Sequence, residues 1–246
     1  MSEMKRLSDR NRAIQEMLTS GEGLKTFYRF VANNPHIALH DACQIVIERP
    51  SASICFSFEE WNAQGRRVTK GRKGIPYYDN DGSKRFVFDV SDTHGDNRYR
   101  RSINPVKKIL DGLDLVNGTE IAGSNRGDYR IMLSGVVNYL GQNEFFTEDE
   151  DRNRLIAEGV TYLLYSTTGF PKDRGITLKG YPYGLSENAD LFREILKTTE
   201  VLQQDVNDAV LNKQSEVPVI DDTEEETVTD EPVIPKSDET HVKTEE

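Results

Sequence analysis

Apolar residues recur at helical spacing in the first 50 residues of the chain. Leu24, Phe27, Tyr28 and Val31 follow the i, i+3, i+4, i+7 pattern of an amphipathic helix. Ser8 is a residue type that caps helices, so we expect a helix to begin there and to end near residue 19. The helices predicted for this part of the chain are residues 8–19, one around 24–31, and about 39–47.

Between residues 53 and 90 the pattern changes to short β-rich runs. Ser57 and Glu60 form a capping box that opens a short helix, which carries Trp61. Phe86 and Phe88 alternate with other residues, so we expect the last strand to bury these two rings. The predicted strands are residues 53–56, 66–73 with a tight turn, 74–78 and 84–90, and the Asp79-Asn80-Asp81-Gly82 sequence between the last two is typical of a hairpin turn.

From residue 103 onward the apolar spacing is helical again. Thr147 and Glu150 have the spacing of a second capping box, which predicts a helix start there, and Ser186 is expected to cap the final helix. The predicted helices are 105–113, 128–140, one from the second capping box to about 166, and 186–211. No residue between 110 and 212 points to chemistry, because the apolar positions there have the spacing of a helical core.

These elements predict an α+β fold. Its N-terminal helices pack on a small antiparallel sheet that contains a β-hairpin, a mainly helical region follows, and a disordered acidic tail ends the chain. The corresponding domains are residues 1–102, 103–212 and 213–246, with the helical region packed on the first domain or separate from it.

The charge of the chain is concentrated at one end. The 246 residues carry a formal charge of −11, and residues 213–246 contain three basic and twelve acidic side chains, which gives 3 − 12 = −9. The first 212 residues therefore carry only 28 − 30 = −2. Because the tail has no aromatic residue and cannot bury enough apolar surface to offset its ordering entropy, we expect it to be disordered.

Several classes of protein are disfavoured by what the sequence lacks. No run of about 18 apolar residues predicts a membrane span, and Cys43 and Cys55 are too few for a disulfide framework, so we expect a cytoplasmic protein. His36 and His40 are four residues apart, but the glutamate of a His-Glu-x-x-His metal motif is missing. Phosphate-binding loops and Gly-x-Ser-x-Gly elbows are absent too. We therefore expect no enzyme, no metal and no cofactor.

A basic segment stands out against this acidic chain. Residues 61–109 contain twelve basic and five acidic side chains, a balance of +7, which is a candidate footprint for a polyanion. Residues 61–76 combine the one tryptophan of the chain, three glycines and five cations. Proteins that bind single-stranded nucleic acid use cations along the phosphates and flat side chains that stack on bases. The alternatives are an ordinary solvated surface and a tryptophan that serves the core.

The same segment resembles the N-terminal, single-stranded-DNA-binding domain of ArdC-type antirestriction proteins. The resemblance covers about residues 10–95 and rests on Trp61, the glycine-rich basic stretch 65–76, and the strand end Val87-Phe88-Asp89-Val90-Ser91-Asp92-Thr93. The family's metallopeptidase domain has no counterpart here, because its His-Glu-x-x-His motif is absent. The later part of the chain, about 104–205, resembles segments that follow this domain in helicase or methylase polypeptides of conjugative elements and phages.

The resemblance implies a non-enzymatic protein of a mobile genetic element that binds and protects single-stranded DNA in the cytoplasm of a bacterial host. The alternatives are an acidic inhibitor or DNA mimic that binds a host nuclease, and an accessory subunit that targets a helicase or methylase to DNA. Partners would accordingly be single-stranded DNA and a helicase, a methylase or a host defence protein. The candidate DNA-binding residues are Trp61, Arg66, Arg67, Lys70, Arg72, Lys73, Tyr77, Lys84, Arg85, Arg98, Arg100 and Arg101.

Overall fold

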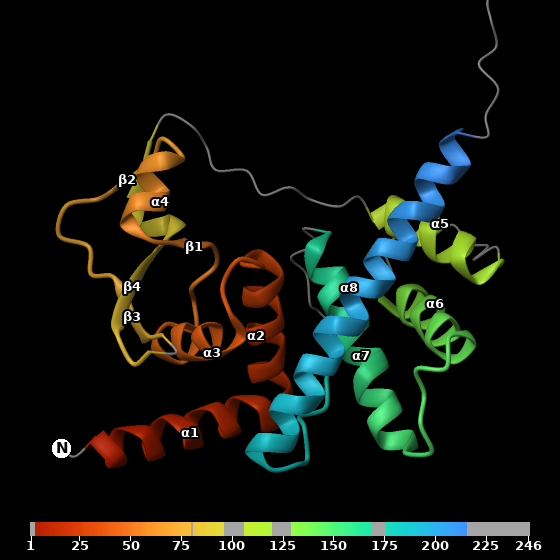
Figure 1. The fold of residues 1–246 in the computed structure, drawn as a ribbon, viewed down its shortest axis with the longest axis horizontal. Helices are drawn as coiled ribbons and strands as arrows, with labels where there is room; N and C mark the ends of the chain where they lie inside the picture. Colours follow the sequence, from red (N-terminus) through yellow and green to blue (C-terminus); the bar gives the residue numbers. More distant parts are fainter. Residues whose placement is uncertain (1–2, 80, 96–105, 120–128, 169–175, 216–246) are drawn as a thin grey trace, which may run out of the picture.

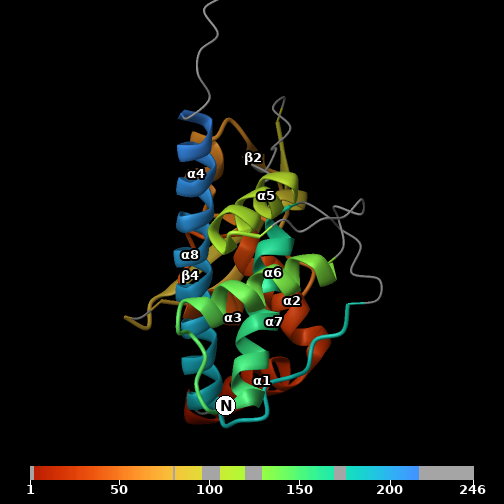
Figure 2. The ribbon, with the colours of Figure 1, turned by 90° about the vertical axis from the view of Figure 1, so that its right-hand side faces the viewer.

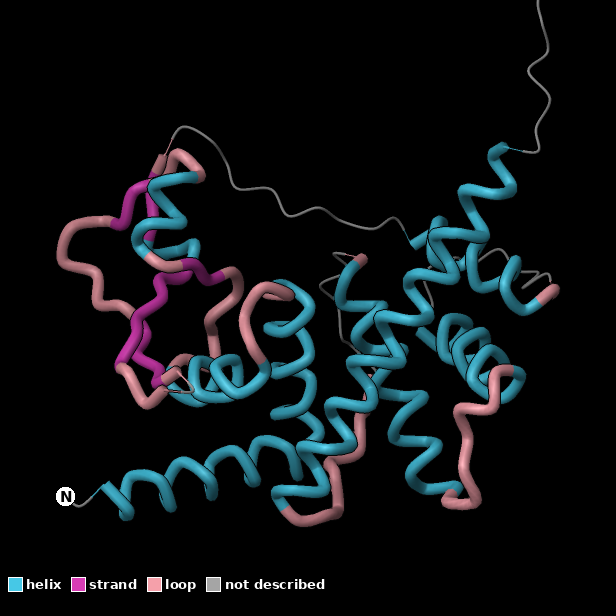
Figure 3. Tube along the Cα trace, viewed as in Figure 1, coloured by secondary structure: helices cyan, strands magenta, loops and turns pink. Residues whose placement is uncertain are grey.

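The computed structural model describes residues 3–79, 81–95, 106–119, 129–168 and 176–215 (Figure 1). Within these ranges the chain is mainly helical, with the strands gathered on one side of the molecule (Figure 3). The helices are α1 (Glu3–Thr19), α2 (Gly21–Asn33), α3 (Leu39–Glu48), α4 (Phe58–Ala63), α5 (Val106–Asn117), α6 (Tyr129–Gln142), α7 (Glu150–Thr167) and α8 (Leu185–Ser215). The strands are β1 (Cys55–Phe56), β2 (Arg67–Val68), β3 (Ile75–Tyr78), β4 (Lys84–Asp89) and β5 (Thr93–His94), with a 3₁₀ turn η1 at Val90–Asp92.

The three N-terminal helices agree with the sequence pattern except at the first helix start. Helix α1 begins at Glu3, so Ser8 lies inside the helix and is not its cap. Helix α2 is capped by Ser20, whose hydroxyl accepts from the Gly23 amide at 3.3 Å. At the other end of α2, the buried Asn34 donates to the carbonyl oxygens of Phe30 (2.7 Å) and Ser53 (2.8 Å). This one amide therefore ends the helix and ties it to the segment that leads into β1.

The strands form two small antiparallel sheets. The first has the order β1-β4-β3, and the second pairs β2 with β5. The β3–β4 hairpin turns where the sequence predicted, with the Gly82 amide donating to the Asp79 carbonyl and Gly82 at a φ of +75°. Glycine suits that left-handed backbone because it has no side chain to clash. The α+β class with a small antiparallel sheet and a hairpin is confirmed.

The outer edge of β3 is closed by a side chain of α3. The Gln44 amide donates to the Tyr78 carbonyl at 2.8 Å, and its oxygen accepts from the Tyr78 amide at 3.1 Å. The neighbouring edge position is Pro76, which has no N–H to offer. The Gln44 side chain therefore occupies the backbone groups that a further strand would pair with, and Pro76 offers no N–H to such a strand. Both features protect this edge against pairing with another strand.

The burial of β4 is the reverse of the prediction. Val87 and Asp89 are buried, Phe88 is half-buried, and Phe86 is 47% exposed. The prediction that this strand buries its two phenylalanines is wrong. The inner face is the one that carries Val87 beside Ile75 of β3, because both side chains belong to the main hydrophobic core.

The helical half packs directly on the N-terminal helices. Helix α2 lies against α7, and α8 runs along both α7 and α5 (Figures 1 and 2). The buried face of α8 includes Leu191, Ile195, Thr198 and Leu202, as its spacing predicted. One cluster of buried apolar side chains extends from α1 through α3 and β3 to α7 and α8. The predicted domain boundary at residue 102 lies outside the described residues, and the helices on either side of it share this core.

Two predicted caps in the helical half differ from the structure. Helix α7 is capped by Asp149, whose carboxylate accepts from the Arg152 amide at 2.9 Å, so Thr147 is not the cap. The Thr147 amide and hydroxyl instead donate to the Asn153 side chain. Helix α8 begins at Leu185, which places Ser186 inside its first turn.

Candidate nucleic-acid interface

Trp61 belongs to the interior of the protein. Its side chain is 0% exposed, and its ring packs edge-on against Phe56 with the centroids 5.0 Å apart. The indole N–H donates to the Phe88 carbonyl at 2.8 Å, which fastens α4 to β4. An indole held in this way has no face open to a base, so the prediction of Trp61 as a stacking residue is wrong.

The strand-end motif that carries the resemblance also supports the fold. The buried Asp89 carboxylate accepts from the Ser53 amide (2.6 Å), the Ser53 hydroxyl (3.0 Å) and the Ser91 amide (2.9 Å). Asp92 is buried as well and forms an ion pair with Arg49, and its second oxygen lies 3.9 Å from Arg72. These carboxylates hold the segment before β1 and the segment after β4 in place.

Arg66 is committed to the same framework. Its guanidinium donates to the Thr93 hydroxyl at 2.9 Å and to the Thr93 carbonyl at 3.2 Å, and it lies over the Trp61 ring at 5.9 Å. Its half-buried side chain therefore joins β2 to β5. The role that this arrangement supports for Arg66 is structural, in place of the predicted DNA contact.

The outer face of the hairpin carries an alternating row of cations and aromatic rings. Side chains of β4 that share a face are two apart, so Lys84 and Phe86 point to the same side, opposite Tyr78 and Pro76 of β3. The Lys84 ammonium lies 5.2 Å from the centre of the Phe86 ring. Arg10, which α1 brings to the hairpin end, lies 4.6 Å from the centre of the Tyr78 ring. We call Arg10, Tyr78, Lys84 and Phe86 the cation–aromatic row.

The basic loop, residues 69–74, adjoins this row. A Cβ added to Gly74 would lie 3.0 Å from the Phe86 Cβ and 3.2 Å from the Phe88 ring, so the loop returns to the sheet in contact with the outer face. Lys70, Arg72 and Lys73 are exposed along it. In Figure 1 the loop projects from the side of the sheet that faces away from α7 and α8. The loop thereby extends the row with three further cations.

The cations of the row, the basic loop and β2 differ in whether they already form ion pairs with carboxylates of the protein. Lys70, Lys73, Lys84 and the exposed Arg67 form no ion pair with any residue in the described ranges. Among the described residues, the one ion pair of Arg72 is its long contact with Asp92, at 3.9 Å. Lys84 on the outer face of the hairpin and Lys70 and Lys73 on the loop beside it are therefore open to a polyanion, and Arg67 is a further cation on β2 that is unpaired among the described residues.

Two further predicted residues lie on the other face of the hairpin. Tyr77 shares the inner face with Ile75 and packs against the core, and burial, followed by the nearby Asp41 carboxylate, raises its pKa. Arg85 pairs with Asp79 at 2.9 Å, and this hydrogen bond is the main cause that lowers the pKa of Asp79. Neither side chain belongs to the row. Arg98, Arg100 and Arg101 lie outside the described residues.

Sequence reasoning missed three members of the row. Phe86 is predicted to lie in the core, Tyr77 and not its neighbour Tyr78 is among the candidate residues, and Arg10 is remote in sequence from the basic segment. The turn between residues 79 and 83 fixes the register, so Lys84 faces Tyr78 and Phe86 faces Pro76. That pairing could have been derived from the hairpin alone, whereas the approach of α1 depends on tertiary packing.

Other kinds of site have little support in the described part of the chain. No group of three His, Cys, Asp or Glu side chains is placed there to hold a metal ion. Both cysteines are buried, and burial raises the pKa of the Cys43 and Cys55 thiols to about 12, far from the range of a reactive thiolate. None of the helices in the described ranges is long and apolar enough to span a bilayer.

Comparisons of the chain with family models, with curated proteins and with solved structures find no match. The likeness to the ArdC-type domain therefore stays a prediction from the sequence, and the function is argued from the geometry of the row and the loop.

Proposed function

We propose that this chain is a non-enzymatic protein that binds single-stranded nucleic acid through the cation–aromatic row and the basic loop. The observation that carries the proposal is the exposed Phe86 ring between Lys84 and the loop that holds Lys73. An exposed ring flanked by cations can bind both the base and the phosphate of a nucleotide, since the ring stacks on the base and the cations neutralise the phosphates.

The geometry favours a single strand over a duplex. The row lies on the short strands of a hairpin, and a base reaches the Phe86 face only if it is unstacked from its neighbours. The side chains of the row carry no arrangement of paired amides that reads a base edge, so binding is expected to depend weakly on sequence. The resemblance to ArdC-type proteins favours DNA as the natural ligand and protection of entering DNA of a mobile element as the role.

Fluorescence anisotropy with a labelled oligothymidylate tests the proposal. We expect binding of the full-length protein at low salt, weaker binding to a duplex of equal length, and affinity that falls as salt rises. For a single strand the slope of log K against log salt is about −0.7 for each phosphate neutralised, so three to five contacts give a slope of about −2 to −3.5.

The deciding variant is Phe86→Ala, with Phe58→Ala as its matched control. Phe58 is a phenylalanine of equal exposure, 49% against 47%, that lies on α4 outside the row. Loss of one stacked base costs about 1–3 kcal/mol, so Phe86→Ala is expected to weaken binding by a factor of about 5–150 while Phe58→Ala leaves it unchanged. Equal affinity of all three folded proteins, or no binding at low salt, would refute the proposal.

A further inference from the structure

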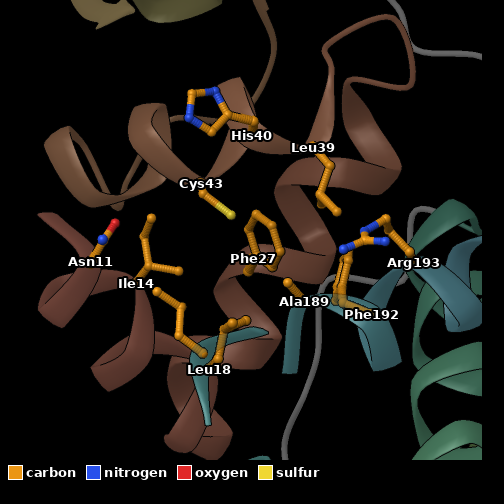
Figure 4. Close-up of a pocket in the computed structure, with 11 residues that line it drawn as sticks. Asn11, Ile14, Leu18, Phe27, Leu39, His40, Cys43, Ala189, Phe192 and Arg193 are labelled. Carbon is orange, nitrogen blue, oxygen red and sulfur yellow. The ribbon is translucent and has the colours of Figure 1, made fainter. Parts of the chain in front are cut away.

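A pocket of about 390 Å³ lies between α1, α2, α3 and the start of α8 (Figure 4). This volume is within the usual range of small-molecule sites, about 300–1,000 Å³. In Figure 4 the Phe27 ring and the Cys43 sulfur point toward its middle. The wall is mostly apolar and is formed chiefly by Ile14, Leu18, Phe27, Leu39, Cys43 and Phe192. Its apolar lining favours a ligand body made of hydrocarbon, because water in such a space finds few hydrogen-bond partners.

Polar side chains are confined to a few positions around this pocket. Asn11 and Arg193 border it from opposite sides in Figure 4, and His40 adds a third polar group. Arg193 pairs with Asp190 one turn earlier on α8, at 2.7 Å. Both partners of this pair are largely exposed, and a guanidinium has five N–H donors, so Arg193 keeps donors for a second acceptor.

The start of α3 adds a second source of positive potential. Leu39 and His40 are the first residues of this helix, and both line the pocket. The N-cap residue is Ala38, whose side chain offers no acceptor to the amides of the first turn. Asp41 in the same turn lies against His40 at 3.3 Å and offsets part of this potential. A helix start whose amides are not capped by a side chain, together with an arginine that lines the same pocket, favours an anionic group on a ligand.

We propose that this pocket binds an amphipathic monoanion, a molecule with a hydrocarbon body and one carboxylate. The hydrocarbon fills the space around Phe27 and Phe192, and the carboxylate lies at the rim, where it accepts from Arg193 beside the first turn of α3. The wall carries no negative charge at Cys43, because burial keeps that thiol protonated. The inference is independent of nucleic-acid binding, since none of the pocket residues belongs to the row or the basic loop.

Calorimetric titration of the full-length protein with decanoate, kept below its micelle-forming concentration, tests the inference. We expect one molecule to bind per chain, and binding at least tenfold weaker for the neutral 1-decanol. Arg193→Gln is expected to weaken decanoate binding at least tenfold. Its matched control is Lys197→Gln, which removes an exposed cation one turn further along α8 that does not line the pocket.

A second variant tests the place of the hydrocarbon. Ala189 lines the pocket from α8, so Ala189→Phe fills it with a ring and is expected to abolish decanoate binding while circular dichroism shows an unchanged fold. The inference is overturned if the folded wild type does not bind decanoate, if decanol binds as tightly, or if Arg193→Gln and Lys197→Gln lose affinity equally. Undiminished binding by folded Ala189→Phe would also overturn the inference. Loss of decanoate binding in Arg193→Gln and Ala189→Phe, but not in Lys197→Gln, supports it, and this result does not depend on whether the protein binds nucleic acid.

Discussion

Asp89 holds two segments of the fold together through one buried carboxylate. Its carboxylate accepts hydrogen bonds from Ser53 on one side and from Ser91 on the other, so it joins two segments that are far apart in sequence. Burial tends to raise its pKa, but the hydrogen bonds from Ser91 and Ser53 outweigh that tendency and lower it. The ionised form is therefore the one that stabilises the native protein.

This lowered pKa predicts a loss of stability in acid. Because the folded pKa of Asp89 lies below the unfolded value of about 3.9, its contribution is fully present above about pH 5. It declines as the pH passes the unfolded pKa and disappears as the pH falls through the folded pKa. At neutral pH, Asp89→Asn is expected to cost about 1–3 kcal/mol, since an amide cannot accept all these hydrogen bonds. Thermal unfolding between pH 6 and 2 checks this, and the variant should lose less stability than the wild type over the acid range. Parallel curves for the two proteins would contradict it.

The sequence predicts an exposed, base-stacking Trp61 and a buried Phe86, whereas in the structure Trp61 is buried and Phe86 is exposed. Trp61→Ala removes a fully buried ring together with its hydrogen bond to Phe88 and is expected to destabilise the protein by about 3–5 kcal/mol. Phe86→Ala removes an exposed ring and is expected to change stability by less than about 1 kcal/mol. Urea unfolding of both variants measures the difference, and an equal loss for the two would show that the outer face of the hairpin is part of the core.

At the scale of elements, Gly159 allows α7 to pack closely against α2 and α8, because it has no side chain at the point where the three helices meet. A Cβ at Gly159 would lie 2.5 Å from the Tyr28 hydroxyl and 2.8 Å from the Ile195 Cδ1. An alanine ordinarily stabilises a helix by about 1 kcal/mol relative to glycine. Here that gain is outweighed, because the new methyl group has to displace two packed helices.

Gly159→Ala is therefore expected to destabilise the protein by about 1–3 kcal/mol, the range for an overpacked core. Gly141→Ala on α6 is the control, since its Cβ would find its nearest neighbour, the Phe146 ring, at an ordinary 3.8 Å. Thermal unfolding should show a lower midpoint for Gly159→Ala and an unchanged or higher one for Gly141→Ala. A higher midpoint for both variants would contradict this expectation, since it would mean that α2, α7 and α8 can move apart to admit the methyl group at little cost in free energy.

How much of these elements could be predicted depends on whether the signal is local. The periodicity of α2 and α8 lies within each helix, and the hairpin turn lies within four residues, so both were found from the sequence. The inner face of β4 was not found from the sequence. Alternation of residue types divides the side chains of a strand between two faces, but it does not determine which face packs on the core. That choice was decided by Asp89 and its partners near residue 53, and the position of Arg10 in the row was decided by α1, which lies far away in sequence.

At the scale of the whole molecule, charge is distributed unevenly between the site and the end of the chain. Of the −11 total, −9 belongs to residues 213–246, and five of the six residues 221–226 are acidic. A negative segment tethered to the protein repels a polyanion whether or not it touches the binding surface. Replacing Asp221, Asp222, Glu224, Glu225 and Glu226 with the corresponding amides is therefore expected to raise oligonucleotide affinity at low salt by a factor of about 2–10.

The same anisotropy titration measures this effect. The gain should fade above about 0.3 M salt, where charges more than about 6 Å apart are screened. An uncharged methylphosphonate oligomer serves as the control and should bind wild type and variant equally. A gain that persists at high salt would instead indicate a direct contact between the tail and the nucleic-acid surface.

The position of the one tryptophan gives this protein two independent optical reporters. Trp61 lies outside the main hydrophobic cluster, under the small sheets, whereas the buried tyrosines Tyr28, Tyr139, Tyr162 and Tyr181 lie in the helical core. Emission excited at 295 nm therefore follows the sheet end of the molecule. Tyrosine absorbance in the near ultraviolet follows mainly the helical end, with a smaller contribution from Tyr77 and Tyr78 of β3. Comparing the two signals during unfolding shows directly whether the part that carries the proposed binding surface melts with the helices or before them.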